Sequence, residues 1–170
     1  MVKSFYEIYG GNNMNKKLCC FYVNDIHLIT MLLPYINERI NESTKVITIL
    51  EEDISESARK VMKGIQGKKS DDLLNIDWKN KSLRYLYESD IQDKLVLISG
   101  SEKFIEEANK IITDRNENCT ILNCYEMMQG SAKLQEILDE HDKIVNTSGE
   151  KYKEEVFTGY TQKSYKKITL

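Results

Sequence analysis

The sequence lacks both a strong excess of charge and a long apolar run. Its 170 residues contain 24 Lys and Arg against 27 Asp and Glu, a formal net charge of -3. A nucleic-acid-binding domain normally carries a basic field, so we expect no direct contact with nucleic acid. The longest apolar stretch, residues 26–36, is interrupted by His27, Thr30 and Pro34 and is too short to span a bilayer. We therefore expect no membrane partner.

Cysteine pairs with the spacing of a metal site are also missing. Cys19 and Cys20 are adjacent in a predicted strand and point to opposite faces. Cys119 and Cys124 lie an odd number of residues apart in another predicted strand, so they also point to opposite faces and cannot converge on a metal. No metal and no other cofactor is therefore predicted. Residues 1–13 lack the continuous apolar core of a secretory signal, so we expect a cytoplasmic protein whose four cysteines are reduced thiols.

An intact phosphate-binding loop is absent too. Residues 64–70 have a similar composition, but their two glycines are too close together and an extra lysine precedes the serine. They also follow a predicted helix rather than a strand, so we interpret them as a helix-end turn. The turn at residues 99–101 is better placed, yet Glu102 and Glu106 oppose a phosphate there, which favours ordinary helix capping.

What the sequence does contain is an alternation of short apolar runs and helical stripes. This alternation, in a chain long enough for one domain, predicts a three-layer α/β fold with a mainly parallel sheet flanked by helices. Strands are predicted at residues 18–23, 45–50, 95–98, 119–126 and, as the last one, 143–147. The expected core-facing helical positions are Ile29, Leu32, Leu33, Ile36 and Ile40, then Ile54, Ala58, Val61, Met62 and Ile65, then Phe104, Ile105, Ala108, Ile111 and Ile112, and, after Ser131, Leu134, Ile137 and Leu138.

Polar residues at the ends of the predicted helices supply caps. Asn24 or Asp25 is expected to cap the first helix, and Asp53 followed by Glu56 resembles a capping pair for the second. Gly64 and Gly67 are expected to close that second helix.

Residues 71–93 give the least clear pattern. Within them, residues 73–78 are predicted as a strand, while residues 82–87 alternate like a strand but also fit a helical turn. Residues 1–16 are interpreted as a flexible lead-in and residues 17–149 as the domain. For the tail at 150–170, a docking segment, an added edge strand and a loosely ordered end are alternatives.

The candidate site lies where the predicted strands end. Glu51 and Glu52 directly follow the second strand, at the carboxyl edge where open α/β sheets bind ligands. Tyr125 and Glu126 finish another strand at the same edge. Convergence with Tyr22 would create a pocket with aromatic walls and carboxylates, so these five residues are predicted to bind a small ligand. A solvated acidic turn is the alternative interpretation of the glutamates.

The run Lys-Val-Ile-Thr-Ile-Leu-Glu-Glu at residues 45–52, with the helix that follows at 55–67, resembles the second strand, paired glutamates and next helix of KaiC-type RecA-like ATPases. The resemblance implies a RecA-like fold in which the glutamates serve catalysis beside a phosphate loop. Here residues 21–25 occupy the place of that loop and contain neither its glycines nor its lysine. This departure implies a RecA-like fold without a phosphate loop.

A second resemblance covers residues 18–149 and is to the MEDS domain, a sensory domain of methanogen and methylotroph regulators. The residues that carry it are Cys20-Phe21-Tyr22, Leu33-Pro34-Tyr35-Ile36, Asn123-Cys124-Tyr125-Glu126 and His141-Asp142-Lys143-Ile144-Val145. The chain departs from the family at Asn123, where the family has cysteine, and at Asp142, where it has proline. The resemblance implies a degenerate RecA-like fold used for sensing or transcriptional regulation.

Three functions remain open at this stage. The first is a non-enzymatic regulator that binds an unknown small molecule and signals through a protein partner, with a homodimer as a further option. The second is a KaiC-like nucleotide-binding enzyme in which Glu51 or Glu52 acts as a general base. The third is an adaptor protein without a ligand.

His141 and His27 are the only histidines, and each lies near a predicted helix end among carboxylates. Surface or capping roles are expected for both. For His141, the surrounding acids favour the imidazolium form, and a structural role with no proton transfer is predicted. Its replacement by alanine is expected to cost about 1 kcal/mol of stability.

Overall fold

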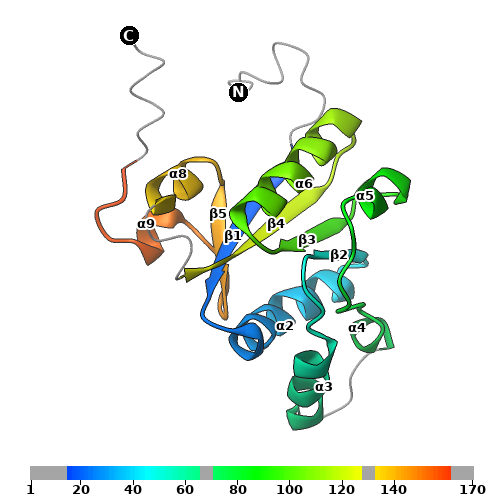
Figure 1. Cartoon of the computed structure of the whole chain (residues 1–170). Coiled ribbons are helices and arrows are strands. Elements are labelled where there is room, and N and C mark those ends of the chain that lie inside the picture. Colours follow the sequence, from blue (N-terminus) through cyan, green and yellow to red (C-terminus); the bar gives the residue numbers. More distant parts are fainter. Residues whose placement is uncertain (1–14, 66–70, 128–132, 162–170) are drawn as a thin grey trace.

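Six strands form one sheet in the order β2-β3-β4-β1-β5-β6, and helices cover both of its faces (Figure 1). The computed structural model describes residues 15–65, 71–127 and 133–161. The strands are β1 (Lys16–Tyr22), β2 (Val46–Leu50), β3 (Leu95–Ser99), β4 (Thr120–Glu126), β5 (Lys143–Asn146) and β6 (Gly149–Lys151). All pairs are parallel except β5 with β6. The predicted three-layer α/β fold is confirmed.

The helices divide between the two faces of the sheet. They are α2 (Asp25–Asn41), α3 (Ser55–Gly64), α4 (Asp71–Leu74), α5 (Arg84–Glu88), α6 (Glu102–Arg115), α8 (Leu134–Asp139) and α9 (Lys153–Val156). Helices α2, α3 and α4 pack on one face, while α5, α6 and α8 pack on the other. The first core lies between the sheet and α2, α3 and α4, and the second core lies between the sheet and α5, α6 and α8. Cys20 belongs to the first core and Cys19 to the second, as expected because adjacent strand residues point to opposite faces. No helix in the described ranges is long and apolar enough to cross a membrane.

The clearest sequence patterns form the centre of the fold. Every residue of β3 is buried, as expected for a strand covered on both faces. Helix α2 begins after Asn24, whose side chain accepts a hydrogen bond from the backbone N–H of His27. Helix α6 begins after Ser101, which accepts from the N–H of Phe104, so the turn before it is a helix cap as predicted.

Two local predictions need correction, and one pair of alternatives is resolved. Residues 73–78 form no strand, because α4 ends at Leu74 and the chain then runs as a loop to Trp78, which is buried. Residues 82–87 contain the start of α5, so the helical alternative was the right one. The carboxylate of Asp53 accepts from the N–H and hydroxyl of Ser55, two residues on, and the helix cap position itself is Ile54.

The chain does not end its sheet at β5. Strand β6 adds an antiparallel edge, which is one of the alternatives considered for the tail. Beyond it, Lys153 is buried and donates from Nζ to the carbonyl of Leu138, while the Tyr160 hydroxyl donates to Asp139. The tail up to residue 161 is therefore packed on α8. The expectations for residues 1–14, Gly67, Ser131 and residues 162–170 lie outside the described residues.

Candidate functional site

The carboxyl ends of β1, β2, β3 and β4 meet around a small cavity of about 100 Å³. The parallel register brings Tyr22 beside Glu126 and Leu50 beside Ser99, which explains the convergence. The lining residues are Tyr22, Asp25, Leu50, Glu51, Glu52, Ile54, Ser99, Gly100, Ser101 and Glu126. Four of the five predicted site residues are thus brought together.

Tyr125 is the predicted site residue that the structure places elsewhere. Because consecutive strand residues alternate between faces, Glu126 turns toward the cavity and Tyr125 away from it. Its ring stacks on Phe21 at 6.0 Å between centroids and meets His141 edge-on at 5.8 Å. Burial raises the pKa of the Tyr125 hydroxyl well above its usual value. Tyr125 is a core residue beneath α8, and its convergence with Tyr22 is not found.

The start of α6 is closed by the side chain of Glu51. Its Oε2 accepts hydrogen bonds from the hydroxyl of Ser101 at 3.0 Å and from the Ser101 N–H at 3.3 Å. A side chain at Gly100 would have its Cβ 2.8 Å from both Glu51 Cβ and Phe104 Cδ1, so the backbone passes directly against Glu51. The protein's own carboxylate therefore occupies the positive end of the helix, where an anion would otherwise bind.

The cavity has a strongly acidic lining. Four carboxylates, from Asp25, Glu51, Glu52 and Glu126, face it, and its described lining includes no Lys, Arg or His. Tyr22 supplies a hydroxyl 3.2 Å from Ser99 Oγ, and burial raises the pKa of Tyr22 to about 12, so this group stays protonated at neutral pH. Such a lining accepts hydrogen bonds and attracts positive charge. In the described parts of the chain, no three His, Cys, Asp or Glu side chains form a group that could hold a metal ion.

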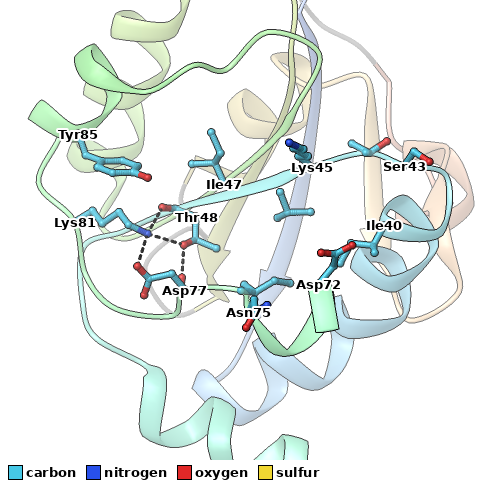
Figure 2. A pocket seen from close by; sticks show the side chains of 13 residues that line it. Ile40, Ser43, Lys45, Ile47, Thr48, Asp72, Asn75, Asp77, Lys81 and Tyr85 are labelled. Carbon is cyan, nitrogen blue, oxygen red and sulfur yellow. Dashed lines mark hydrogen bonds and ion pairs between the residues drawn. The ribbon is translucent and has the colours of Figure 1, made fainter. Parts of the chain in front are cut away.

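A second and larger cavity, of about 520 Å³, lies beside β2 (Figure 2). It runs along the outer edge of this strand, with Ile40 and Ser43 at one end and Lys81 and Tyr85 at the other. Asp72, Asn75 and Ile76 form a wall on the α4 side. Sequence reasoning missed this cavity because it depends on how residues 71–85 pack, and that segment carries no clear periodic pattern.

Lys81 closes one half of the β2 edge. Its backbone N–H donates to the carbonyl of Leu50 at 2.8 Å, and its Nζ donates to the carbonyl and the hydroxyl of Thr48. The same Nζ lies 3.1 Å from a carboxylate oxygen of Asp77 and 5.0 Å from the ring centroid of Tyr85. The side chain is only 13% exposed. Lys81 is thus a fixed structural element at the end of the cavity.

His141 differs from its predicted state. Its Nδ1 bonds to the carbonyl of Ile137 in the last turn of α8, so the expected capping role is confirmed. The ring is only 3% exposed, however, and burial lowers the pKa of His141 to about 4, which contradicts the expected imidazolium form. Asp142, one of the acids thought to stabilise the charge, accepts instead from the N–H of Lys17. His27 takes the expected capping position, accepting at Nδ1 from the N–H of Val23.

The likeness to KaiC-type ATPases and to the MEDS domain depends on the short motifs quoted above, and Asn123 and Asp142 depart from the second of these patterns. Comparison of the chain with family models, with curated proteins and with solved structures finds no match.

Proposed function

We propose that this chain is a non-enzymatic regulatory domain that binds a small ligand at the carboxyl edge of its sheet and passes the bound state to a protein partner. The observation that supports this most is the lining of the edge cavity, with four carboxylates and no described basic residue. The ligand is one that presents a cationic or hydroxylated head group. Tyr22, Glu52 and Glu126 are the side chains proposed to receive it, and Glu51 positions the turn at Ser101.

The size of the cavity limits what can enter. Pockets for complete drug-sized ligands are about 300–1,000 Å³. At about 100 Å³, this cavity admits a head group such as an ammonium or a guanidinium, while the rest of the ligand stays outside. Binding of this kind changes the charge around the Glu51–Ser101 contact, at the start of α6.

The same lining disfavours the nucleotide-binding enzyme. A triphosphate would meet the carboxylates of Asp25, Glu51 and Glu52, and the start of α6 already has an internal carboxylate partner. The separation between Glu51 and an anion would be a few ångströms, where like charges at an effective dielectric constant of about 20 repel by about 4 kcal/mol. General-base catalysis on a bound nucleotide is therefore not the function we propose.

The test is a thermal-shift series with the full chain. Putrescine, spermidine, choline and arginine are the cationic probes, and ATP with magnesium is the nucleotide probe. We expect at least one cationic probe to raise the melting temperature, because a ligand that binds only the native state stabilises it by mass action. Glu126→Gln and Glu52→Gln should remove this shift, whereas Glu56→Gln, on the exposed surface of α3, should retain it. A shift with ATP alone, followed by hydrolysis, would reject the proposal in favour of the enzyme.

A further inference from the structure

A third cavity, of about 290 Å³, lies at the amino edge of the sheet, at the opposite end of the strands from the acidic site. Lys16 of β1, Leu95 of β3 and Thr120 of β4 line it and are register partners. Neighbouring strands are about 4.8 Å apart, so these three side chains stand side by side on one face. Arg39, in the last turn of α2, and Thr44, in the loop after it, complete the wall, and the N–H of Thr44 donates to the carbonyl of Arg39.

The lining of this amino-edge cavity is basic. Lys16, Arg39 and Lys94 belong to it, and Asp93 is the one carboxylate among its described residues. The cavity at the carboxyl edge has the reverse composition, with four carboxylates and no described basic residue. The two ends of the sheet therefore suit ligands of opposite charge. Lys16 is held by the largely buried carboxylate of Glu150, so Arg39 and Lys94 are the cations open to a ligand.

The counter-charges of these two cations stand outside the cavity. Nη2 of Arg39 lies 3.0 Å from a carboxylate oxygen of Glu42, and Nζ of Lys94 lies 3.8 Å from one of Asp90. Both acids are exposed, and neither lines the cavity. Ion pairs between exposed groups contribute little to stability. An anion in the cavity can therefore share both cations without breaking a strong internal contact.

The wall also carries donors that have no acceptor. Within the described residues, the half-buried hydroxyls of Thr44 and Thr120 make no hydrogen bond. Nε of Arg39 is buried and lacks a hydrogen-bond partner in the same part of the chain, while the ring of Tyr35, 5.3 Å from Cζ, orients the guanidinium. Buried and half-buried donors normally have acceptors, so this set favours a ligand rich in acceptor oxygens.

We propose that the amino-edge cavity binds a compact oxyanion of the size of a sugar phosphate or a tricarboxylate. Arg39 and Lys94 supply the positive charge, and the hydroxyls of Thr44 and Thr120 donate to the oxygen atoms of the ligand. A volume of about 290 Å³ is close to the lower limit of pockets that enclose a small molecule, so the whole anion can enter. This inference does not depend on a ligand at the carboxyl edge.

The test is calorimetric titration of the full chain with inorganic phosphate, glucose 6-phosphate and citrate, which distinguish a phosphate ligand from a carboxylate one. We expect at least one of them to bind with a dissociation constant below about 1 mM. Arg39→Gln should weaken this binding at least about tenfold, because it removes a cation that can donate to an oxyanion. Lys60→Gln removes the same charge from the exposed surface of α3 and should change the affinity by less than about twofold.

A second variant covers the case in which Arg39→Gln does not fold. Thr120→Val removes a hydroxyl without changing the charge, and valine is favoured in strands, so this protein should fold. We expect its affinity for the anion to fall at least about threefold, as for a lost hydrogen bond. Glu126→Gln, at the acidic cavity, should leave anion binding unchanged, so the two proposed sites can fail separately.

Amide resonances locate the bound anion. Those of Thr44 and Thr120 should shift on titration, and those of Ser99 and Glu126, at the other end of the sheet, should not. The proposal is overturned if none of the three anions binds, if the shifts gather at the carboxyl edge, or if Thr120→Val binds as tightly as the wild type. It is also overturned if Lys60→Gln weakens binding as much as the site variants, since the attraction is then that of the whole surface.

Discussion

The Nδ2 of Asn123 lies 2.9 Å from Nε2 of His141, in a buried polar network between the sheet, α6 and α8. Asn123 and Asn109 exchange two amide hydrogen bonds of 2.8 and 3.0 Å, and Asn109 also donates to the carbonyl of Ile105. Every donor of this network then has an acceptor only if His141 carries its proton on Nδ1 and accepts at Nε2. The geometry thus selects the neutral imidazole.

Removing either partner should cost more than a surface cap would. We expect Asn123→Ala and His141→Ala each to lower the free energy of unfolding by about 2–4 kcal/mol, because each leaves buried polar groups unsatisfied and opens a cavity. The double variant should lose less than the sum, since both changes break the same contact. Urea unfolding of the four proteins measures this coupling. Additive losses would mean that the two side chains do not act as a pair.

The buried His141 should also make stability depend on pH. Its pKa is about 4 in the folded protein and about 6.5 in an unfolded chain, so between these values the unfolded state binds a proton that the folded state does not. The stabilising effect is complete above pH ~6.5 and is lost as the pH is lowered, and the loss amounts to about 3 kcal/mol by pH ~4. Unfolding titrations should show this slope in the wild type. His141→Gln offers similar hydrogen bonds without a titrating group and should lack it.

Gly100 should tolerate no side chain. In Gly100→Ala the new Cβ would lie 2.8 Å from Glu51 Cβ and Phe104 Cδ1, so the start of α6 or the Glu51 backbone has to move. We expect a loss of about 1–3 kcal/mol, the usual cost of overpacking. Gly64→Ala is the matched control, because nothing lies within 4 Å of its Cβ and alanine favours the helix. Equal melting temperatures for the two variants would contradict this account.

Continuous apolar strands and regular helical stripes were sufficient to predict the centre of the fold. Every residue of the apolar strand β3 is buried, and the buried residues of α2 and α6 include most of their apolar stripes. The gathering of Tyr22, Glu51, Glu52 and Glu126 was also predictable, since parallel strands end at one edge. Tyr125 was misplaced because its neighbour Glu126 was taken as a partner, although adjacent strand residues face opposite ways.

The remaining errors arise where contacts are distant in sequence. The acids flanking His141 in the chain suggested a charged ring, yet the positive groups Lys17 and Lys153 lie close enough to act against its protonation. The cavity beside β2 depends on Thr48, Asp77 and Lys81, which are joined by side-chain and backbone bonds across about thirty residues and carry no periodic signal.

Lys153 should hold the end of the described chain on α8. Its buried Nζ donates to the carbonyl of Leu138 at 3.0 Å and lies 5.0 Å from the ring centroid of Tyr160. Lys153→Met keeps the aliphatic stem but loses the donor, while the carbonyl of Leu138 keeps the N–H of His141 as a partner. We expect a cost of about 1–3 kcal/mol for the lost hydrogen bond from the charged amine and the lost contact with the ring. Amide exchange should become faster in α9 and β6 before it changes in β3. The exposed neighbour provides the control, since Glu154→Gln should leave exchange in α9 as it is in the wild type. If exchange in α9 is equally slow in Lys153→Met, the tail is held by Phe157 and the other apolar contacts of the second core rather than by this lysine.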